Sequence, residues 1–257
     1  MRVTQAGVFT PRTVHAAGVA CFLLAGAAMI PPLLVRGAPL AALLVTSCAA
    51  GYLYTGGPYP YGYRGLGDLA VLVFFGFVAT GGVRHVHRGG DDWFEGALVD
   101  PDSAVASAQV GCLATALIAI NNLRDARTDA KVGKRTLPVM FGETFGRWEI
   151  TALVCAPFAL NAYWAAKRWP SSGTGTEAGA TATAIATAIA TARGISRAAA
   201  LTSATAPLAA HVARRAWTHD VASPEFNRLM SVAAALHLAF GALLALGVAL
   251  DAGVTFR

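Results

Sequence analysis

Long uncharged runs of apolar residues are the feature that most constrains how this chain can fold. A bilayer core is about 30 Å thick, and a helix needs roughly 20 apolar residues to cross it. Only 13% of the 257 residues are charged, whereas a soluble domain has about 25%. We therefore predict an all-α, polytopic transmembrane helical bundle. The spans are expected at residues 14–31, 40–54, 69–83, 104–123, 150–166, 198–213 and 229–250.

The charge pattern indicates an orientation in the membrane rather than a nucleic-acid partner. The net charge is +6, but the basic residues are scattered over short loops and form no folded basic patch. Alternating sides places the N-terminus and the loops 55–68, 124–149 and 214–228 together, with 12 of the 20 Lys and Arg residues. The positive-inside rule makes this face cytoplasmic. The sequence thus predicts a multi-pass cell-membrane protein whose polar loops face the cytoplasm.

Residues 121–137, NNLRDARTDAKVGKRTL, form a charged island in this apolar chain. On a helix at about 100° per residue, Asn122, Asp125 and Asp129 fall in a narrow arc, with Arg124 and Arg127 on the other side. Two carboxylates at i and i+4 repel each other by a few tenths of a kcal/mol unless a cation lies between them. The pattern favours Mg²⁺, held by carboxylate and amide oxygens with water and phosphate oxygens in the remaining positions.

Two further cations, Lys134 and Arg135, follow Gly133 and are expected to meet phosphate charge. A solvated loop with helical salt bridges is the alternative, but the like-charge spacings along this helix fit it poorly. A phosphate-binding P-loop is excluded, because it needs Gly at position 128 and Ser or Thr directly after the lysine. The chain has Thr128 and Arg135 there.

A second block, residues 52–68, reads YLYTGGPYPYGYRGLGD. Gly and Pro at this density prescribe an irregular backbone. At membrane depth such a backbone is tolerated only where it lines a cavity or is buried in protein. Tyr54, Tyr61 and Tyr63 would then form an aromatic wall for a substrate, and Arg64 a fixed cation. The alternative is an interfacial aromatic belt followed by a turn.

Two other segments carry weaker signals. Residues 84–102 contain His85, His87, Asp91 and Asp92, and we interpret them as a solvated extracytoplasmic loop rather than a metal site. Residues 171–197 are a low-complexity Ala/Thr insert, either an Ala-rich helical extension or a disordered segment.

The pattern N-x-x-D-x-x-x-D followed by G-K-x-T-L resembles the second aspartate-rich motif of the UbiA-type intramembrane prenyltransferases. The block at 52–68 is similar to the 1,4-dihydroxy-2-naphthoate polyprenyltransferase branch of that superfamily. The resemblance implies a polar central cavity where Mg²⁺ bridges a polyprenyl diphosphate to Asn122, Asp125 and Asp129. Lys134 and Arg64 would stabilise the departing pyrophosphate. The aromatic acceptor then attacks the allylic cation and loses CO₂, which gives demethylmenaquinone.

The chain also departs from this family. Members have about nine spans and an earlier aspartate-rich motif, and this sequence resembles the family only beyond that point. The expectation is one domain over residues 1–257 without the first two family helices, through a late start codon, a split gene or a truncated inactive relative. A non-catalytic membrane protein that binds polyprenyl diphosphate or quinone, a small transporter, and a prenyltransferase for another aromatic acceptor remain alternatives.

Overall fold

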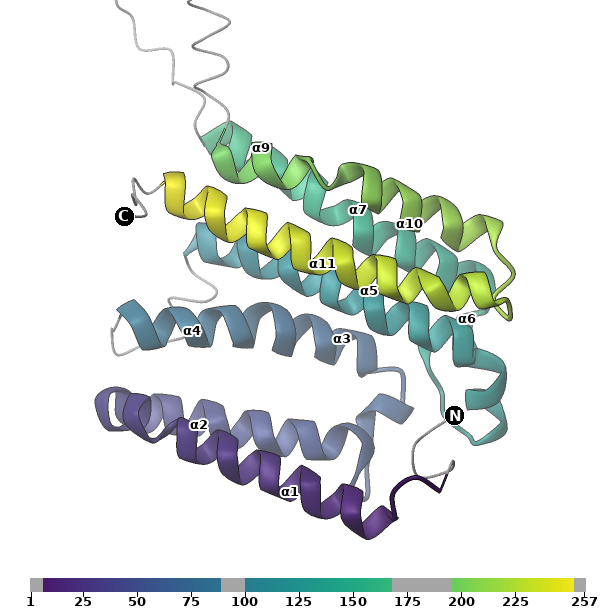
Figure 1. Ribbon diagram of the computed structural model, residues 1–257, viewed down its shortest axis with the longest axis horizontal. Helices are drawn as coiled ribbons and strands as arrows, with labels where there is room; N and C mark the ends of the chain where they lie inside the picture. Colours follow the sequence, from purple (N-terminus) through teal and green to yellow (C-terminus); the bar gives the residue numbers. More distant parts are fainter. Residues whose placement is uncertain (1–6, 89–99, 168–195, 252–257) are drawn as a thin grey trace, which may run out of the picture.

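The computed structural model describes residues 7–88, 100–167 and 196–251, and its regular elements are all helical (Figure 1). The predicted all-α fold class is confirmed. The elements are α1 (Pro11–Ala28), α2 (Ile30–Thr55), the 3-10 turn η1 (Tyr61–Tyr63), α3 (Gly67–Val71), the π-helical η2 (Leu72–Val78), α4 (Ala79–Arg88), α5 (Pro101–Lys131), α6 (Leu137–Phe141), α7 (Glu143–Lys167), α9 (Arg197–Ser203), α10 (Ala206–Thr218) and α11 (Pro224–Asp251).

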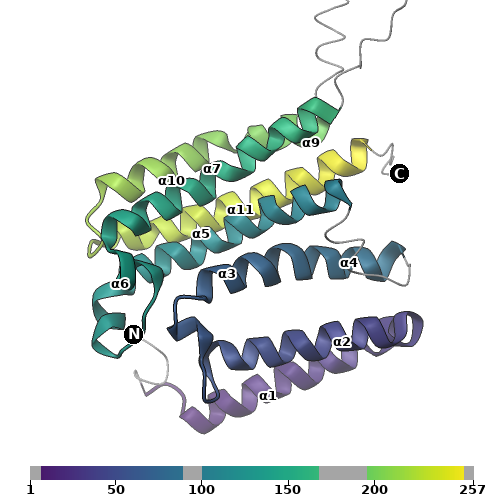
Figure 2. The ribbon, with the colours of Figure 1, turned by 180° about the vertical axis from the view of Figure 1, so that it is seen from behind.

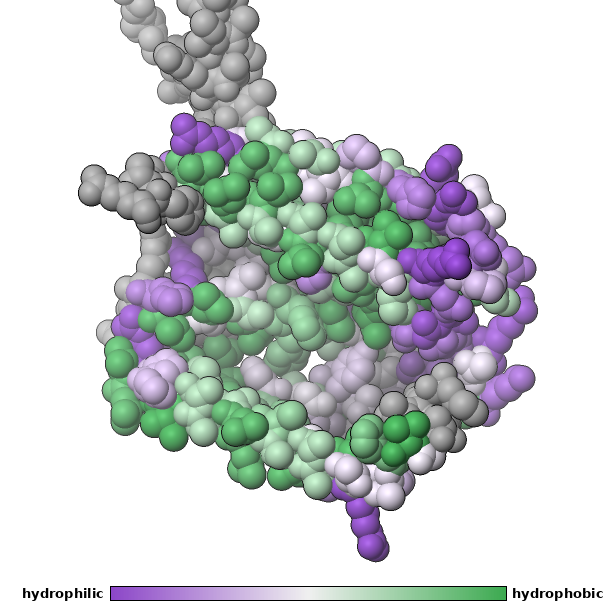
Figure 3. Space-filling model, viewed as in Figure 1, coloured by the Kyte–Doolittle hydropathy of each residue, from purple (hydrophilic) through white to green (hydrophobic). Residues whose placement is uncertain are grey.

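The seven predicted spans fall on these helices, although the sixth is divided between α9 and α10. Within the described residues, four segments are long and apolar enough to cross a membrane: Ile30–Thr55, Gly67–His87, Pro101–Lys131 and Pro224–Asp251. Large apolar side chains such as Leu34 (82% exposed) and Leu238 (76%) point outward. Figure 3 shows apolar surface along the helices and hydrophilic surface gathered at one end. The chain is a polytopic helical membrane protein.

The packed core lies in the later helices. Ile120 of α5, Ile150 of α7, Val212 of α10 and Phe240 of α11 are fully buried together. Figures 1 and 2 show these helices as one bundle, with the α1–α2 pair lying apart from it beyond α3 and α4. In agreement, α1 has no buried residue and α2 has only Leu40. The early helices therefore add surface to the molecule more than core.

Two glycines set how the third span lies against α5. A Cβ on Gly76 of η2 would lie 2.7 Å from the Ser107 carbonyl oxygen and 2.9 Å from Gly111 Cα. Small residues at such crossings let transmembrane helices approach closely. The segments run in opposite directions, so Asp68, about two turns before Gly76, is brought level with Asn122, about three turns after Gly111. This close crossing positions the polar cluster described below.

The predicted loop at residues 84–102 is wrong in its first part. Helix α4 continues to Arg88, so His85 and His87 are helical, and His85 is only 5% exposed. The Arg36 guanidinium of α2 donates to the Val86 carbonyl oxygen at 2.7 Å and 3.0 Å, which ties α2 to the end of α4. Hydropathy detects helices that face lipid. It did not detect the polar end of α4, because that end packs against protein. Asp91 and Asp92, and residues 171–195 of the predicted insert, lie outside the described residues.

Candidate active site

A glycine turn folds the charged island back on itself at the end of α5. Gly133 has φ +72°, and its amide and that of Lys134 donate to the carbonyl oxygens of Ala130 and Asp129. These two hydrogen bonds form a Schellman motif, in which glycine is favoured at the position just after the helix. The turn sends Lys134 back along the helix that it follows. Its Nζ reaches the Asp129 carboxylate at 2.8 Å.

The Asp129–Lys134 pair is largely shielded from solvent. The Asp129 side chain is 11% exposed and that of Lys134 is 17% exposed. The Lys134 ammonium also lies 6.0 Å from the centre of the Tyr63 ring. Because this cation and carboxylate are close and poorly solvated, they interact more strongly than a surface pair.

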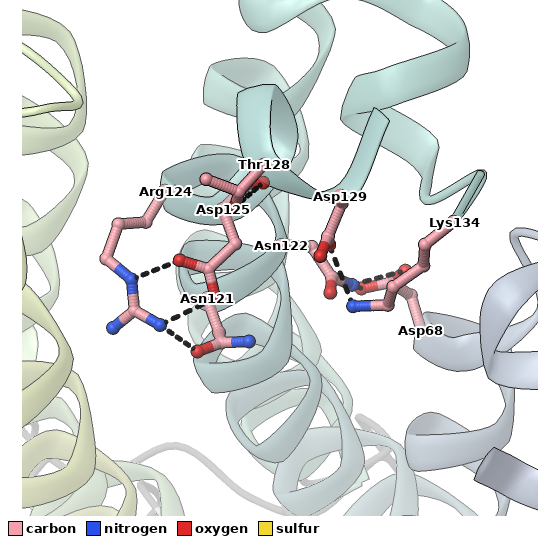
Figure 4. A network of polar contacts seen from close by, with 8 residues as sticks. All are labelled: Asp68, Asn121, Asn122, Arg124, Asp125, Thr128, Asp129 and Lys134. Atoms are coloured by element: carbon pink, nitrogen blue, oxygen red, sulfur yellow. Dashed lines mark hydrogen bonds and ion pairs between the residues drawn. The ribbon is translucent and has the colours of Figure 1, made fainter. Parts of the chain in front are cut away.

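Asp68 joins the same cluster from a distant part of the sequence. It lies in the first turn of α3 and is 4% exposed. The Asn122 side-chain amide, itself on a residue that is 2% exposed, donates to both Asp68 carboxylate oxygens at 3.2 Å. Figure 4 shows Asp68, Asn122, Asp129 and Lys134 on one side of α5. We call these four residues the acid–lysine cluster.

Asp68 is a site residue that the sequence interpretation missed, because it was treated as the last residue of a loop. One signal was available. Asp68 is the single carboxylate in the block at 52–68, and it directly precedes an apolar span. An acid at the start of a membrane-spanning apolar segment is costly to bury and therefore marks a candidate functional position.

Asp125, the third predicted metal ligand, faces a different partner. The Arg124 guanidinium binds both of its carboxylate oxygens at 2.8 Å and also donates to the Asn121 side-chain oxygen at 2.5 Å. In Figure 4 this group lies apart from Asp129. The structure brings Asn122 and Asp129 together, but it does not bring Asp125 to them.

Each carboxylate of the island therefore has its own cation. Lys134 approaches Asp129, and Arg124 reaches around the helix to Asp125. The prediction that ion pairs fit this helix poorly was wrong, because the cations that pair with these carboxylates do not lie at i+4. The partner of Asp125 is the adjacent Arg124, and the partner of Asp129 is Lys134, which the turn at Gly133 folds back toward the helix.

The tyrosine block and the charged island meet directly. The Arg135 amide donates to the Tyr63 carbonyl oxygen at 2.8 Å, which joins the loop after α2 to the loop after α5. Tyr54 and Tyr61 pack edge to face, with ring centres 5.4 Å apart. The Tyr61 hydroxyl donates to the Ala50 carbonyl oxygen at 2.7 Å, and partial burial raises the Tyr61 pKa. These contacts hold Tyr63 next to Lys134.

The other two predicted substrate-binding cations point elsewhere. Arg64 is exposed, and its guanidinium lies 4.4 Å from the centre of the Tyr59 ring. Arg135 is also exposed, and its backbone rather than its side chain makes the contact with Tyr63. Among the tyrosines predicted to bind substrate, Tyr63 lies near Lys134, and the Tyr54 hydroxyl lies beside Gly67, the residue before Asp68.

Glu149, near the start of α7, is a second acid that the sequence interpretation missed. Burial, together with the nearby charge of Asp68, raises the pKa of Glu149 to about 8. Its Oε2 has no hydrogen-bond partner among the described residues. Glu149 is therefore protonated at neutral pH, which avoids placing another negative charge near Asp68.

The donor set of the cluster suits Mg²⁺. No group of three or more His, Cys, Asp or Glu side chains is arranged as a metal site within residues 7–88, 100–167 and 196–251. Mg²⁺, however, is commonly bound through one or two carboxylates, with water and substrate phosphates completing its shell. Asp68, Asp129 and the Asn122 side-chain oxygen provide two carboxylates and an amide, all hard oxygen donors. These residues fit a Mg²⁺ ion that is bound together with a phosphate-bearing ligand.

An apolar cavity of about 530 Å³ lies between α2 and the η2–α4 segment. Leu40, Leu43, Leu44, Phe74 and Val78 are among its lining residues. Phe74 is only six residues beyond Asp68 on the same continuous span. The molecule therefore presents a polar cluster at the start of this span and an apolar cavity farther along it.

Comparison with known proteins gives a family match over most of the chain. The family model described as the UbiA prenyltransferase family matches residues 1–230. The chain is 34% identical over 184 residues to the 1,4-dihydroxy-2-naphthoate octaprenyltransferase of Mycobacterium tuberculosis, covering 63% of this chain and 60% of that protein. It is 33% identical over 180 residues to the Escherichia coli protein of the same name, covering 64% and 56%.

A shorter match, 41% identical over 107 residues, is to the Haemophilus influenzae protein of that name and covers 42% of this chain and 32% of the relative. The chain thus spans 60% or less of each of these relatives. No solved structure matches the chain.

Proposed function

Because this chain belongs to the UbiA prenyltransferase family, we propose that it transfers a polyprenyl group from polyprenyl diphosphate to 1,4-dihydroxy-2-naphthoate. The products are demethylmenaquinol, which is the hydroquinone form of demethylmenaquinone, together with CO₂ and pyrophosphate, so the step belongs to menaquinone synthesis. The named relatives support this acceptor. The observation that carries the proposal is the meeting of two distant blocks, residues 52–68 and 121–137, in the buried acid–lysine cluster.

In the proposed mechanism the cluster binds the diphosphate. The Lys134 ammonium turns from Asp129 toward the phosphate oxygens, where it offsets the negative charge that grows as the allylic C–O bond breaks. Asp129, Asp68 and Asn122 would hold Mg²⁺, which neutralises diphosphate charge when it is bound. Asn122 fits this role, because its amide nitrogen is held by Asp68 and no described residue donates a hydrogen bond to its side-chain oxygen.

The apolar cavity between α2 and η2 is the proposed site for the prenyl chain. Walls such as Leu43, Phe74 and Val78 exclude water, which would otherwise capture the allylic cation. A ring carbon of the naphthoate attacks that cation, and loss of the ring carboxylate as CO₂ restores aromaticity. Tyr63 lies beside Lys134 and is proposed to pack against the acceptor ring. The positive-inside pattern supports a site on the cytoplasmic side of the cell membrane.

The test is turnover by the purified chain in lipid nanodiscs. Polyprenyl diphosphate, 1,4-dihydroxy-2-naphthoate and Mg²⁺ are supplied, and the prenylated product is measured by mass spectrometry. We expect Asp129→Asn and Lys134→Met to lower the rate by a factor of about 100 or more, as for removal of a transition-state charge contact. Asp220→Asn, which removes an exposed carboxylate outside the cluster, is the matched control and should retain the rate. Equal rates for all three variants would remove the cluster from the mechanism.

A second candidate function is a non-catalytic membrane protein that binds polyprenyl diphosphate. The observation in its favour is that the described residues contain no group of three acidic or histidine ligands for a metal. This candidate predicts binding of the diphosphate without product, even on long incubation. Binding and turnover measured on the same preparation separate the two functions.

A further inference from the structure

A groove of about 260 Å³ between α10 and α11 is separate from the acid–lysine cluster and shares no lining residue with it. His211 and Arg215 are four residues apart on α10 and so share one helix face, and His219 directly follows the end of that helix. On α11, the lining residues are Glu225, Arg228, Leu229 and Val232. The groove thus has two guanidinium groups and one carboxylate, with an apolar wall on one side.

Neither arginine in the groove forms an ion pair with another described residue. The ion pairs that the described residues form involve other cations, and Arg215 contacts the His219 ring nitrogen at 2.9 Å instead. Arg215 is not needed to cap the end of α10. The carbonyl oxygens of Ala216 and His219 there accept hydrogen bonds from Arg147 instead. Glu225 is the one carboxylate that lines the groove, so the two guanidinium groups leave the groove with a net positive charge, which suits an anion.

Arg228 also lies near the beginning of α11, which starts at Pro224. The helix dipole is positive at that end and favours anions rather than cations. The dipole and the Arg228 side chain therefore add to the same positive potential. Glu225 in the first turn of α11 offsets part of this dipole, so the positive potential of the groove comes mainly from the two guanidinium groups.

The depth of the groove matches the membrane interface. Trp217, between Arg215 and His219 in α10, packs edge to face on Trp148 with ring centres 5.0 Å apart, and both rings are partly exposed. Exposed tryptophans gather at the level of lipid head groups. Leu229 and Val232 follow Arg228 on α11, which is long and apolar enough to span the bilayer. Figure 3 shows that hydrophilic surface gathers at this end of the molecule.

We infer that this groove binds the phosphate group of an anionic phospholipid. Arg215 and Arg228 contact the phosphate oxygens, and guanidinium groups suit this geometry because they offer paired N–H donors. Leu229 and Val232 contact the glycerol and the first acyl carbons. Basic pockets between transmembrane helices at the cytoplasmic side are a common form of lipid head-group site. A free phosphate ion shares the head-group chemistry but gains nothing from the apolar wall.

The test measures lipid binding to the full purified chain by native mass spectrometry, with phosphatidylglycerol and phosphatidylcholine as the two lipids. Wild-type protein should prefer phosphatidylglycerol. Each arginine near an anionic head group is worth roughly a fivefold change in affinity. The double variant Arg215→Gln with Arg228→Gln should therefore bind phosphatidylglycerol about 30-fold more weakly. The matched control, Arg12→Gln with Arg214→Gln, removes two exposed arginines outside the groove and should leave the preference unchanged.

Two further measurements keep the inference falsifiable if the glutamine variant is unstable. Val232→Phe fills the groove without removing charge and should also weaken phosphatidylglycerol binding. Inorganic phosphate in excess should not displace the lipid. An unchanged preference in the double variant or in Val232→Phe, or an equal loss in the control, would overturn the inference. Displacement by inorganic phosphate would do so as well, since it would make the groove a small-anion site.

Discussion

Lys134→Met is expected to destabilise the fold more than Asp129→Asn, although the two residues form one ion pair. The Lys134 ammonium lies 2.8 Å from Asp129, and its charge also acts on Asp68. Removing it leaves two shielded carboxylates without a counter-charge. Removing the Asp129 charge leaves Lys134 with Asp68 as a remaining partner.

The exposure of the pair sets the expected magnitude. Breaking a fully buried pair costs about 3–5 kcal/mol, and exposed pairs are worth about 0–1 kcal/mol. With side chains 17% and 11% exposed, Lys134→Met should lower the free energy of unfolding by about 3 kcal/mol and Asp129→Asn by about 2 kcal/mol. Unfolding by SDS titration, followed by tryptophan fluorescence, measures both, and the double variant should show a coupling of about 1–2 kcal/mol. A smaller loss for Lys134→Met than for Asp129→Asn would refute the reasoning.

Two further predictions test the surroundings of the cluster. The pKa of Glu149 in the folded chain, about 8, is above its ordinary value of 4.5, so the folded state holds a proton that the unfolded state releases. The proton on Glu149 therefore stabilises the folded state fully below about pH 4.5, and this stabilisation is lost as the pH rises toward about 8. The melting temperature of the wild type should fall over that range, and Glu149→Gln should make the fall smaller. Gly76→Ala places a Cβ 2.7 Å from a backbone oxygen, whereas Gly241→Ala meets nothing within 4 Å. Gly76→Ala should lower the free energy of unfolding by about 1–3 kcal/mol and Gly241→Ala should not lower it, and equal losses in SDS titrations would contradict the close crossing.

The sequence predicts the helices of this protein well, because membrane solvation imposes a strong pattern. A helix in lipid must be apolar over about 20 residues, and the predicted spans accordingly fall on helices. The short α6, Leu137–Phe141, was not predicted, because its five residues are too few for a periodic signal. The division of the sixth span into α9 and α10 was also missed, since hydropathy does not report a local break in a helix.

The candidate site was predicted only in part, because its key contacts join residues far apart in the chain. The island at 121–137 identified Asp129 and Lys134, which do form a pair, but spacing along one helix could not show that the turn at Gly133 would bring them together. Asp68 lies 54 residues from its partner Asn122. That contact depends on the crossing of η2 and α5 at Gly76 and Gly111, which no local pattern specifies.

The central claim is that the acid–lysine cluster holds the diphosphate together with Mg²⁺. Isothermal titration of a polyprenyl diphosphate into the purified chain, with and without Mg²⁺, measures this directly. Wild-type protein should bind only with Mg²⁺, and Asp129→Asn should weaken that binding by about tenfold or more, the loss of one charge-assisted contact, while Asp220→Asn should bind as wild type. Binding that is independent of Mg²⁺, or that is equally tight in Asp129→Asn, would contradict the claim.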